Sequence, residues 1–160
     1  MKNHFLDDMD HNLWIFLHQV RDIIFRAREK ELRQYGITPV QAGMLLILTI
    51  PGGKSSPSEI AKWMVRKPHT ISGFISRMEK GGLVKREYDQ GNKGRIIVTI
   101  TQKGKQTYKE LYIDSTKRQS IKQIFSCLSE EEHRQLWSIL EKLRESGLNN
   151  LHAVERLPFP

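Results

Sequence analysis

Three histidines near the amino terminus and one cysteine are the residues whose types most readily support metal binding or catalysis. His4, His11 and His18 recur every seven residues. On a helix this spacing separates neighbouring imidazoles by roughly 10.5 Å along the axis, too far to share one ion. Cys127 has no second cysteine with which to form a disulfide or a zinc site, and is interpreted as a packed thiol. Because an enzyme needs a nucleophile–base pair or a metal cluster, these residues predict no catalytic residue, no metal site and no cofactor.

The segment 68–80 indicates a different chemistry, hydrogen bonding to DNA. Ile71, Phe74, Ile75 and Met78 recur at helical spacing and predict the buried stripe of an amphipathic helix. The remaining surface is polar, mostly short and free of carboxylates over its first three turns, whereas a merely solvated face usually mixes Glu with Lys. A helix that enters a major groove needs such a surface. The predicted contact residues of this helix are Pro68, His69, Thr70, Ser72, Gly73, Ser76 and Arg77.

The positive charge of the chain is concentrated around that helix. The 160 residues carry a formal net charge of +8, with 26 Lys and Arg against 18 Asp and Glu. Between residues 54 and 105 there are twelve basic residues and four acidic ones, so the flanking segments together are neutral. Such focusing is expected of a surface that binds phosphates, because each neutralised phosphate releases counterions. A solvated basic face would carry the same charge, so the charge supports DNA binding only together with the pattern of residues 68–80.

The elements around that helix predict a helix-turn-helix. Residues 38–41 (Thr-Pro-Val-Gln) form a capping box with proline at the first helical position. Residues 56–59 (Ser-Pro-Ser-Glu) repeat the device and open a short helix through about Val65. Arg66 and Lys67 then lead into the third helix, which ends at Lys80 before two glycines suited to a C-cap. The residues expected to contact the DNA backbone are Lys54, Ser56, Arg66 and Lys67.

A basic hairpin follows the third helix. Residues 83–88 and 96–100 have the composition of strands, and the glycine-rich tip between them carries Lys93 and Arg95. A cation on such a tip is attracted by the potential of a narrow minor groove. The hairpin is therefore predicted to be the wing of a winged helix, with Lys93 and Arg95 contacting DNA.

Helices with apolar stripes are predicted on both sides of this region. The stripe of the first helix comprises Leu13, Phe16, Leu17, Val20, Ile23, Ile24 and Ala27. Thr101 is expected to cap a helix that runs toward Leu128, and a capping box at 129–132 opens a last helix that ends or bends at Gly147. The stripe of the last helix comprises Leu136, Ile139, Leu140 and Leu143. Two apolar ends predict a homodimer, whose recognition helices would lie about 34 Å apart, one turn of DNA.

The ordered set of these motifs resembles the MarR (multiple-antibiotic-resistance regulator) family. The resemblance is carried by Ile37-Thr38-Pro39-Val40-Gln41, Glu59-Ile60-Ala61, Thr70-Ile71-Ser72, the run from Arg77 to Arg86, and the run from Val98 to Gly104. The family implies a homodimer, usually a repressor, that loses DNA affinity when a small aromatic or phenolic effector binds. The wing departs from the family pattern, because Asn92-Lys93-Gly94-Arg95 stands where relatives usually have Asp-x-Arg. Whether Lys93 or Arg95 enters the minor groove is therefore left open.

The sequence thus predicts a mainly α fold with a small β-wing. Its expected regions are an N-terminal dimerisation helix (1–34), a winged helix-turn-helix that binds DNA (35–101) and C-terminal dimerisation helices (102–160). The crevice between dimerisation helices and winged core is the expected effector site. Its candidate residues are Trp14, His18, Tyr108 and Tyr112.

The expected function is regulation of transcription by binding double-stranded DNA in the cytoplasm. No secretory signal and no membrane span is expected, because no run approaches about 18 consecutive apolar residues. The alternative is a winged helix that binds protein or RNA without small-molecule control, since a fold does not fix a function.

Overall fold

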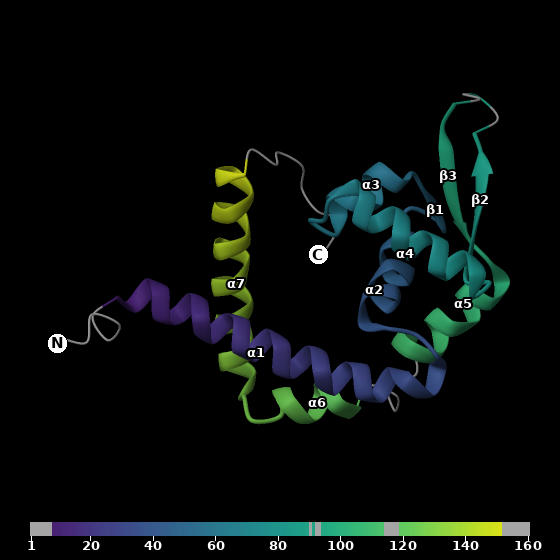
Figure 1. Ribbon diagram of the computed structural model, residues 1–160. Coiled ribbons are helices and arrows are strands. Elements are labelled where there is room, and N and C mark those ends of the chain that lie inside the picture. Colours follow the sequence, from purple (N-terminus) through teal and green to yellow (C-terminus); the bar gives the residue numbers. More distant parts are fainter. Residues whose placement is uncertain (1–7, 90, 92–93, 114–118, 152–160) are drawn as a thin grey trace, which may run out of the picture.

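In a computed structural model, residues 8–89, 91, 94–113 and 119–151 are described, and these form a mainly α-helical chain with one small antiparallel sheet (Figure 1). This is the predicted fold class. The helices are α1 (Met9–Leu32), α2 (Pro39–Thr49), α3 (Pro57–Trp63), α4 (Pro68–Lys80), α5 (Gln102–Tyr108), α6 (Gln119–Phe125) and α7 (Glu130–Asn150). The strands are β1 (Lys54–Ser55), β2 (Val84–Tyr88) and β3 (Ile96–Ile100), in the spatial order β1-β3-β2.

Local capping chemistry sets the start of three helices where the sequence predicted it. Thr38, Ser56 and Ser129 each form a complete capping box at the N-termini of α2, α3 and α7. In each box the hydroxyl accepts from the backbone N–H three residues on, and the Gln or Glu side chain at that position accepts from the backbone N–H of the cap. Two N–H groups that the helix itself leaves unpaired are thereby satisfied, which stabilises the first turn.

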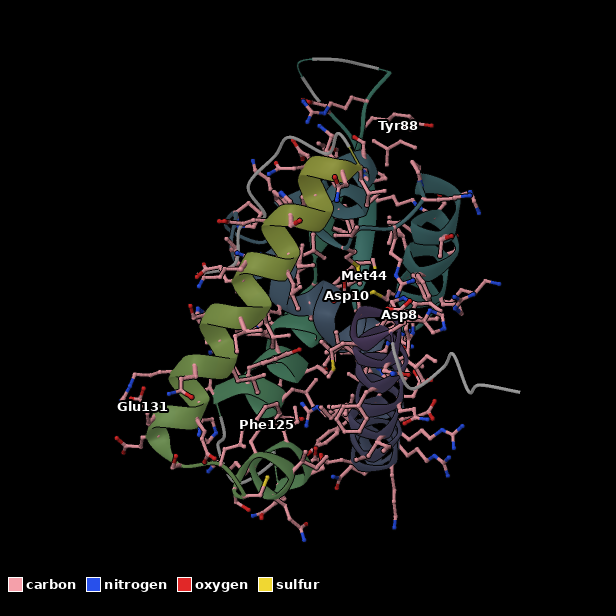
Figure 2. The ribbon with its side chains drawn as sticks, turned by 90° about the vertical axis from the view of Figure 1, so that its left-hand side faces the viewer. Asp8, Asp10, Met44, Tyr88, Phe125 and Glu131 are labelled. Atoms are coloured by element: carbon pink, nitrogen blue, oxygen red, sulfur yellow. The ribbon has the colours of Figure 1, made fainter. Side chains whose placement is uncertain are left out.

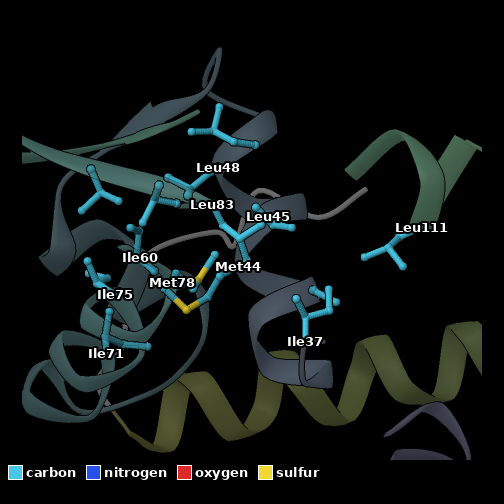
Figure 3. Close-up of a cluster of buried hydrophobic side chains, with 14 of the residues drawn as sticks. Ile37, Met44, Leu45, Leu48, Ile60, Ile71, Ile75, Met78, Leu83 and Leu111 are labelled. Atoms are coloured by element: carbon cyan, nitrogen blue, oxygen red, sulfur yellow. The ribbon is translucent and has the colours of Figure 1, made fainter. Parts of the chain in front are cut away.

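A single apolar core joins the helix-turn-helix to the wing (Figure 3). Side chains from α2, α3 and α4 converge there with residues of the sheet. The core includes Met44, Leu45, Leu48, Ile60, Ile71, Ile75, Met78, Leu83, Val84, Val98 and Ile100. Because the stripe of α4 is buried in this core, its other face is held outward in a fixed orientation.

The wing hairpin pairs Val84 with Ile100 at its root and Tyr88 with Ile96 toward its tip. The root also packs against α5 at Gly104, where a Cβ would lie only 2.1 Å from the carbonyl oxygen of Leu83. Only glycine fits at this position, since any larger residue would force α5 away from the sheet.

The chain after α5 corrects one prediction. In place of a continuous helix from residue 102 toward Leu128, α5 passes into a π-helical segment, Lys109–Ile113, and a separate α6 begins at Gln119. The π-helical segment buries Leu111 in the core. A π-helical turn is wider than an α-helical turn and usually occurs as a single turn that interrupts a helix.

A buried ion pair fastens α6 to α1. Arg28 pairs with Glu31, which also accepts from both the backbone N–H and the hydroxyl of Ser120 at the start of α6. Burial raises the pKa of Glu31, but the hydrogen bonds from Ser120 and Arg28 outweigh it and the pKa is lowered. The carboxylate thus stays charged and holds the two helices together.

Two further predictions are wrong in detail. The last helix neither ends nor bends into a new segment at Gly147 but continues to Asn150. Cys127 is exposed and not packed. It lies just beyond α6, and its thiol donates to the carbonyl of Ile124.

The terminal helices leave large apolar side chains exposed. On α1 these include Leu13, Trp14, Phe16, Leu17, Val20 and Ile23, and on α7 Trp137, Ile139, Leu140 and Leu143. In Figures 1 and 2 the wing, with Tyr88, lies at the opposite end of the molecule from the junction of α6 and α7, with Phe125 and Glu131. No helix among the described residues is long and apolar enough to cross a membrane.

Candidate nucleic-acid interface

The recognition helix α4 presents its predicted polar face to solvent. Pro68, His69, Ser72 and Arg77 are exposed, and Thr70, Gly73 and Ser76 are half-buried at the edges of the face. The cap residue Lys67 makes no side-chain capping bond, and the first turn contains no acidic residue. This surface is therefore polar, accessible and free of negative charge over its first turns.

Arg77 and Gly73 lie together on that face. The Arg77 guanidinium stacks over the ring of Phe74, with its carbon 4.7 Å from the ring centre. A Cβ added at Gly73 would meet nothing of the chain closer than Arg77 Nη1, at 3.9 Å. The absence of a side chain at Gly73 thus serves no packing need of the folded chain itself.

At the N-terminus of α3, Ser56 forms the capping box that the sequence predicts. Ser56 is only 3% exposed, and its hydroxyl accepts from the backbone N–H of Glu59. Its side chain therefore caps α3, while its neighbour Ser58 is exposed. Lys54, also predicted to contact the backbone, is exposed on β1.

The turn between α3 and α4 holds a valine in an unfavourable conformation. Val65 has φ of +50°, and Arg66 N–H and Val65 N–H donate back to the carbonyls of Ala61 and Lys62. These two bonds form a Schellman motif, in which the left-handed position is usually glycine. Arg66 and Lys67 follow on the surface, as a contact with the DNA backbone would require.

Arg95 of the wing forms an ion pair with Glu59 of α3. Its Nη2 lies 3.2 Å from Glu59 Oε1, and both side chains are about half exposed. The pKa of Glu59 is lowered, chiefly by hydrogen bonds from the Ser56 N–H and the Ser55 hydroxyl, and also by the charge of Arg95. Lys93, the other predicted wing contact, lies outside the described residues.

Arg86 is a functional candidate that the sequence analysis missed. From β2 it reaches α4, donating to Glu79 Oε2 at 3.0 Å, to Ser76 Oγ at 2.8 Å and to the Ser72 carbonyl at 3.2 Å. Its backbone N–H also donates to Glu79 Oε1. A signal was present, because strand alternation places Arg86 on the same face as the buried Val84, where a charge needs partners.

The four acids of the basic region are all engaged within the chain. Glu79 binds Arg86, and Glu59 binds Arg95. Glu87 accepts from Lys85 and Thr99, which lowers its pKa, and Asp89 accepts from the N–H of Gly91. Glu59, Glu87 and Asp89 line an open groove of about 690 Å³ between α3 and the wing. Glu59, Glu87 and Asp89 thus lie outside α4, and Glu79, the one acid on α4, is paired with Arg86.

The four candidate effector residues form two separate groups within one chain. Trp14 and His18 contact one another on the exposed half of α1, with ring centres 4.8 Å apart. Tyr108 and Tyr112 stack with centres 5.2 Å apart and pack against the core of the winged region. Within the described ranges, no cluster of His, Cys, Asp and Glu is arranged to hold a metal ion.

An exposed polar helix beside a basic wing, on a tightly packed helix-turn-helix, defines a winged helix-turn-helix DNA-binding protein. Comparison with known proteins agrees. The crystal structures of the organohalide-sensing transcriptional regulator RdhR, in a 2,4-dichlorophenol-bound and a ligand-free form, are 30% identical in sequence. They cover 96% of this chain and 90% of theirs, with a TM-score of 0.86.

Two further relatives extend the comparison. The transcriptional repressor MdtR of Bacillus subtilis is 25% identical over 142 residues, which are 89% of this chain and 87% of MdtR. A MarR mutant from E. coli complexed with operator DNA shares the fold, with a TM-score of 0.75, 20% identity and coverage of 82% and 93%. No family model matches the sequence. The chain belongs to the MarR family of transcriptional regulators, and the reading as a protein- or RNA-binding module is not favoured.

Proposed function

We propose that this protein is a homodimeric repressor that binds a pseudo-palindromic operator in the cytoplasm and releases it when a small phenolic or aromatic molecule binds. The observation that carries the DNA-binding part is the exposed, acid-free face of α4, from His69 to Arg77, within the region that holds the whole net charge. Such a regulator acts through binding equilibria, and no catalytic role is proposed for it.

The proposed regions are a dimerisation helix at 1–34, a DNA-binding winged helix at 35–101 and dimerisation helices at 102–160. The exposed stripes of α1 and α7 support a dimer, because apolar surface of this extent is rarely left in water. A two-fold dimer would present two copies of α4 to successive turns of one face of the DNA.

The proposed DNA contacts combine base recognition and backbone binding. The candidate DNA contacts of α4 are Pro68, His69, Thr70, Ser72, Gly73, Ser76 and Arg77. Among these, Thr70, Ser72 and Arg77, with His69 beside them, are proposed to read base edges in the major groove. Lys54, Arg66 and Lys67 contact phosphates, as does the N-terminus of α3 at Ser56, and Lys93 or Arg95 reaches the minor groove.

The effector is proposed to bind between the dimerisation helices and the winged region. The phenolic ligand of RdhR supports this class of molecule. Trp14 and His18 form one aromatic pair on α1, and Tyr108 and Tyr112 form another beside the winged core. We propose that helices of both subunits bring the two pairs to one site. An effector shifts the equilibrium only by its difference in affinity for the DNA-bound and free conformations.

Selection of DNA fragments from a random library tests the function directly. We expect enrichment of a sequence with two related half-sites, bound with an affinity that falls steeply as salt rises. A panel of phenols and aromatic acids, titrated into the preformed complex and followed by fluorescence anisotropy, then tests the effector. Failure to enrich any sequence would refute specific DNA binding. Enrichment without release by any compound would refute only the ligand response.

A further inference from the structure

The junction between α4 and β2 is the point that DNA backbone must cross in the proposed complex. If α4 occupies a major groove and the wing reaches the neighbouring minor groove, one sugar–phosphate strand separates the two. That strand passes over the side of α4 that faces β2. The contacts of Arg86 identify this side, because they join β2 to Ser72, Ser76 and Glu79 along one edge of the helix.

Arg86 fixes the hydrogen-bonding polarity of Ser76. A guanidinium has only donors, so the oxygen of Ser76 must be the acceptor in the 2.8 Å bond from Arg86 Nη2. The hydroxyl proton of Ser76 is then left to donate. No acceptor for that proton is found in the part of the chain that the structure describes, and the side chain is only half-buried. Ser76 is therefore oriented as a donor toward solvent.

The surroundings of this donor suit an anion. Both carboxylate oxygens of Glu79 are occupied by Arg86, one by its backbone N–H and the other by its guanidinium. The carboxylate thus points to β2, away from the exposed face. Ser72, one turn before Ser76, is exposed on the same edge and offers a second hydroxyl.

We propose that Ser76 donates a hydrogen bond to the phosphate that lies between the two grooves, and that Arg86 is the positioning residue that makes Ser76 a donor. This inference rests on the proposed function. A phosphate is favoured over a base because Ser76 is short and sits at the edge of α4, whereas base edges lie deeper in the groove. Serine hydroxyls commonly contact phosphate oxygens in protein–DNA complexes.

The test compares Ser76→Ala with Ser76→Thr on a duplex that the wild-type protein selected from a random library. Ser76→Ala should bind every duplex roughly tenfold more weakly, as expected for the loss of a hydrogen bond to a charged acceptor. The ranking of sequences and the salt dependence should not change, because no base contact and no cation is removed. Ser76→Thr keeps the hydroxyl and should restore most of the affinity. Thermal unfolding verifies that each variant is folded.

Arg86→Lys tests the positioning role, since it keeps the charge but loses the forked geometry. Arg86→Lys should weaken DNA binding about as much as Ser76→Ala does. The double variant should bind only slightly more weakly than either single variant. Additive losses would overturn the role of Arg86.

Single methylphosphonate substitutions along the duplex locate the contact. At one position in each half-site, the methylphosphonate should reduce the DNA affinity of the wild-type protein clearly more than it reduces the affinity of the Ser76→Ala variant. If Ser76→Ala binds DNA as tightly as the wild-type protein, the proposed phosphate contact is refuted. It is also refuted if Ser76→Ala changes the ranking of sequences while every methylphosphonate weakens both proteins' binding equally. A wild-type protein that selects no duplex would refute the proposed function itself, which separates the two outcomes.

Discussion

On the exposed face of α4, Gly73 and Arg77 contribute in opposite ways. The guanidinium of Arg77 stacks on Phe74, and the side chain is exposed to solvent. Gly73 brings no side chain, and its own chain leaves the space over it open. One residue can therefore provide hydrogen bonds while the other permits close approach, as a helix in a major groove requires.

Replacing Gly73 by alanine should separate stability from DNA binding. A glycine inside a helix costs about 0.5–1 kcal/mol relative to alanine, so Gly73→Ala should raise the free energy of unfolding by about that amount. DNA affinity should fall by roughly tenfold, or about 1.4 kcal/mol, because the methyl group meets the groove. Gly43→Ala in α2 is the matched control, since a Cβ there meets nothing within 4 Å and a Cβ at Gly73 meets only the flexible end of Arg77, at 3.9 Å. It should gain stability and keep its affinity. Equal affinities for the two variants would show that Gly73 does not approach DNA.

Arg77→Ala should remove sequence preference. An arginine that binds guanine through two hydrogen bonds provides about 1–3 kcal/mol of discrimination against other bases. The variant should bind selected and scrambled duplexes with similar affinity in a competition assay. Arg134→Ala removes an exposed arginine from the first turns of α7 and should leave the preference unchanged. A variant at Arg77 that still prefers the selected duplex would make Arg77 only a surface charge.

Among the elements, the turn between α3 and α4 stores strain at Val65. A residue with a Cβ in the left-handed region costs about 1–2 kcal/mol, and the branched side chain of valine adds to it. Val65→Asn should therefore stabilise the protein by about 1 kcal/mol, since asparagine tolerates this conformation. The measurement is the midpoint of chemical denaturation at an unchanged slope. Val65→Ala keeps an ordinary Cβ and should recover clearly less. Equal gains would place the strain in the branched side chain alone.

The wing should contribute affinity that does not depend on sequence. Replacing Lys93 and Arg95 together by alanine should weaken binding to all duplexes and flatten the salt slope by up to about two units, one for each cation removed. Lys122→Ala with Lys142→Ala removes two cations from the terminal helices and should leave the slope unchanged. A slope unaffected by the wing substitutions would mean that the wing does not touch DNA.

The ion pair of Arg95 allows a second measurement on the wing. Glu59→Gln keeps the capping function, as Gln41 does at the same position of α2, but releases Arg95. If Arg95 enters the minor groove, this release should strengthen binding. Weaker binding would instead indicate that the ion pair holds the wing in place.

The sequence predicts an element well when the residues that form it lie close together along the chain. Thr38, Ser56 and Ser129 act on residues three positions away, so the starts of α2, α3 and α7 were predicted correctly. The polar face of α4 was also evident, because its buried stripe recurs within one helix.

The missed features depend on longer-range packing. Arg95 and Glu59 are 36 residues apart, and only the folded wing brings them together. The π-helical segment 109–113 could not be foreseen either, because it buries Leu111 in a core whose other members lie far from it in the sequence. Val65 adopts a left-handed conformation that its own residue type disfavours, so no feature of the sequence predicted it.

At the scale of the whole molecule, α1 links the two ends to the DNA-binding region. Leu32, the last residue of α1, lies in the core that orients α4. The neighbouring Glu31, paired with Arg28 one turn earlier, holds α6 through Ser120, and α6 leads into α7. Buried contacts thus connect the terminal helices to the core that orients α4.

The exposed stripe of α1 allows the dimer to be tested without disturbing this linkage. Phe16 is 62% exposed, so Phe16→Glu should leave the fold of one chain intact while placing a charge within the apolar interface. Gln19→Glu adds the same charge to the same helix outside the stripe and serves as the control. Sedimentation should show a monomer for Phe16→Glu and a dimer for wild type and Gln19→Glu. Because the dimer binds two half-sites at once, the monomer should lose at least tenfold in affinity for the full operator while binding a single half-site as wild type does. If Phe16→Glu remains a dimer and keeps its affinity for the full operator, the dimer interface lies elsewhere. Deletion of residues 1–30 would then also be expected to leave the dimer intact.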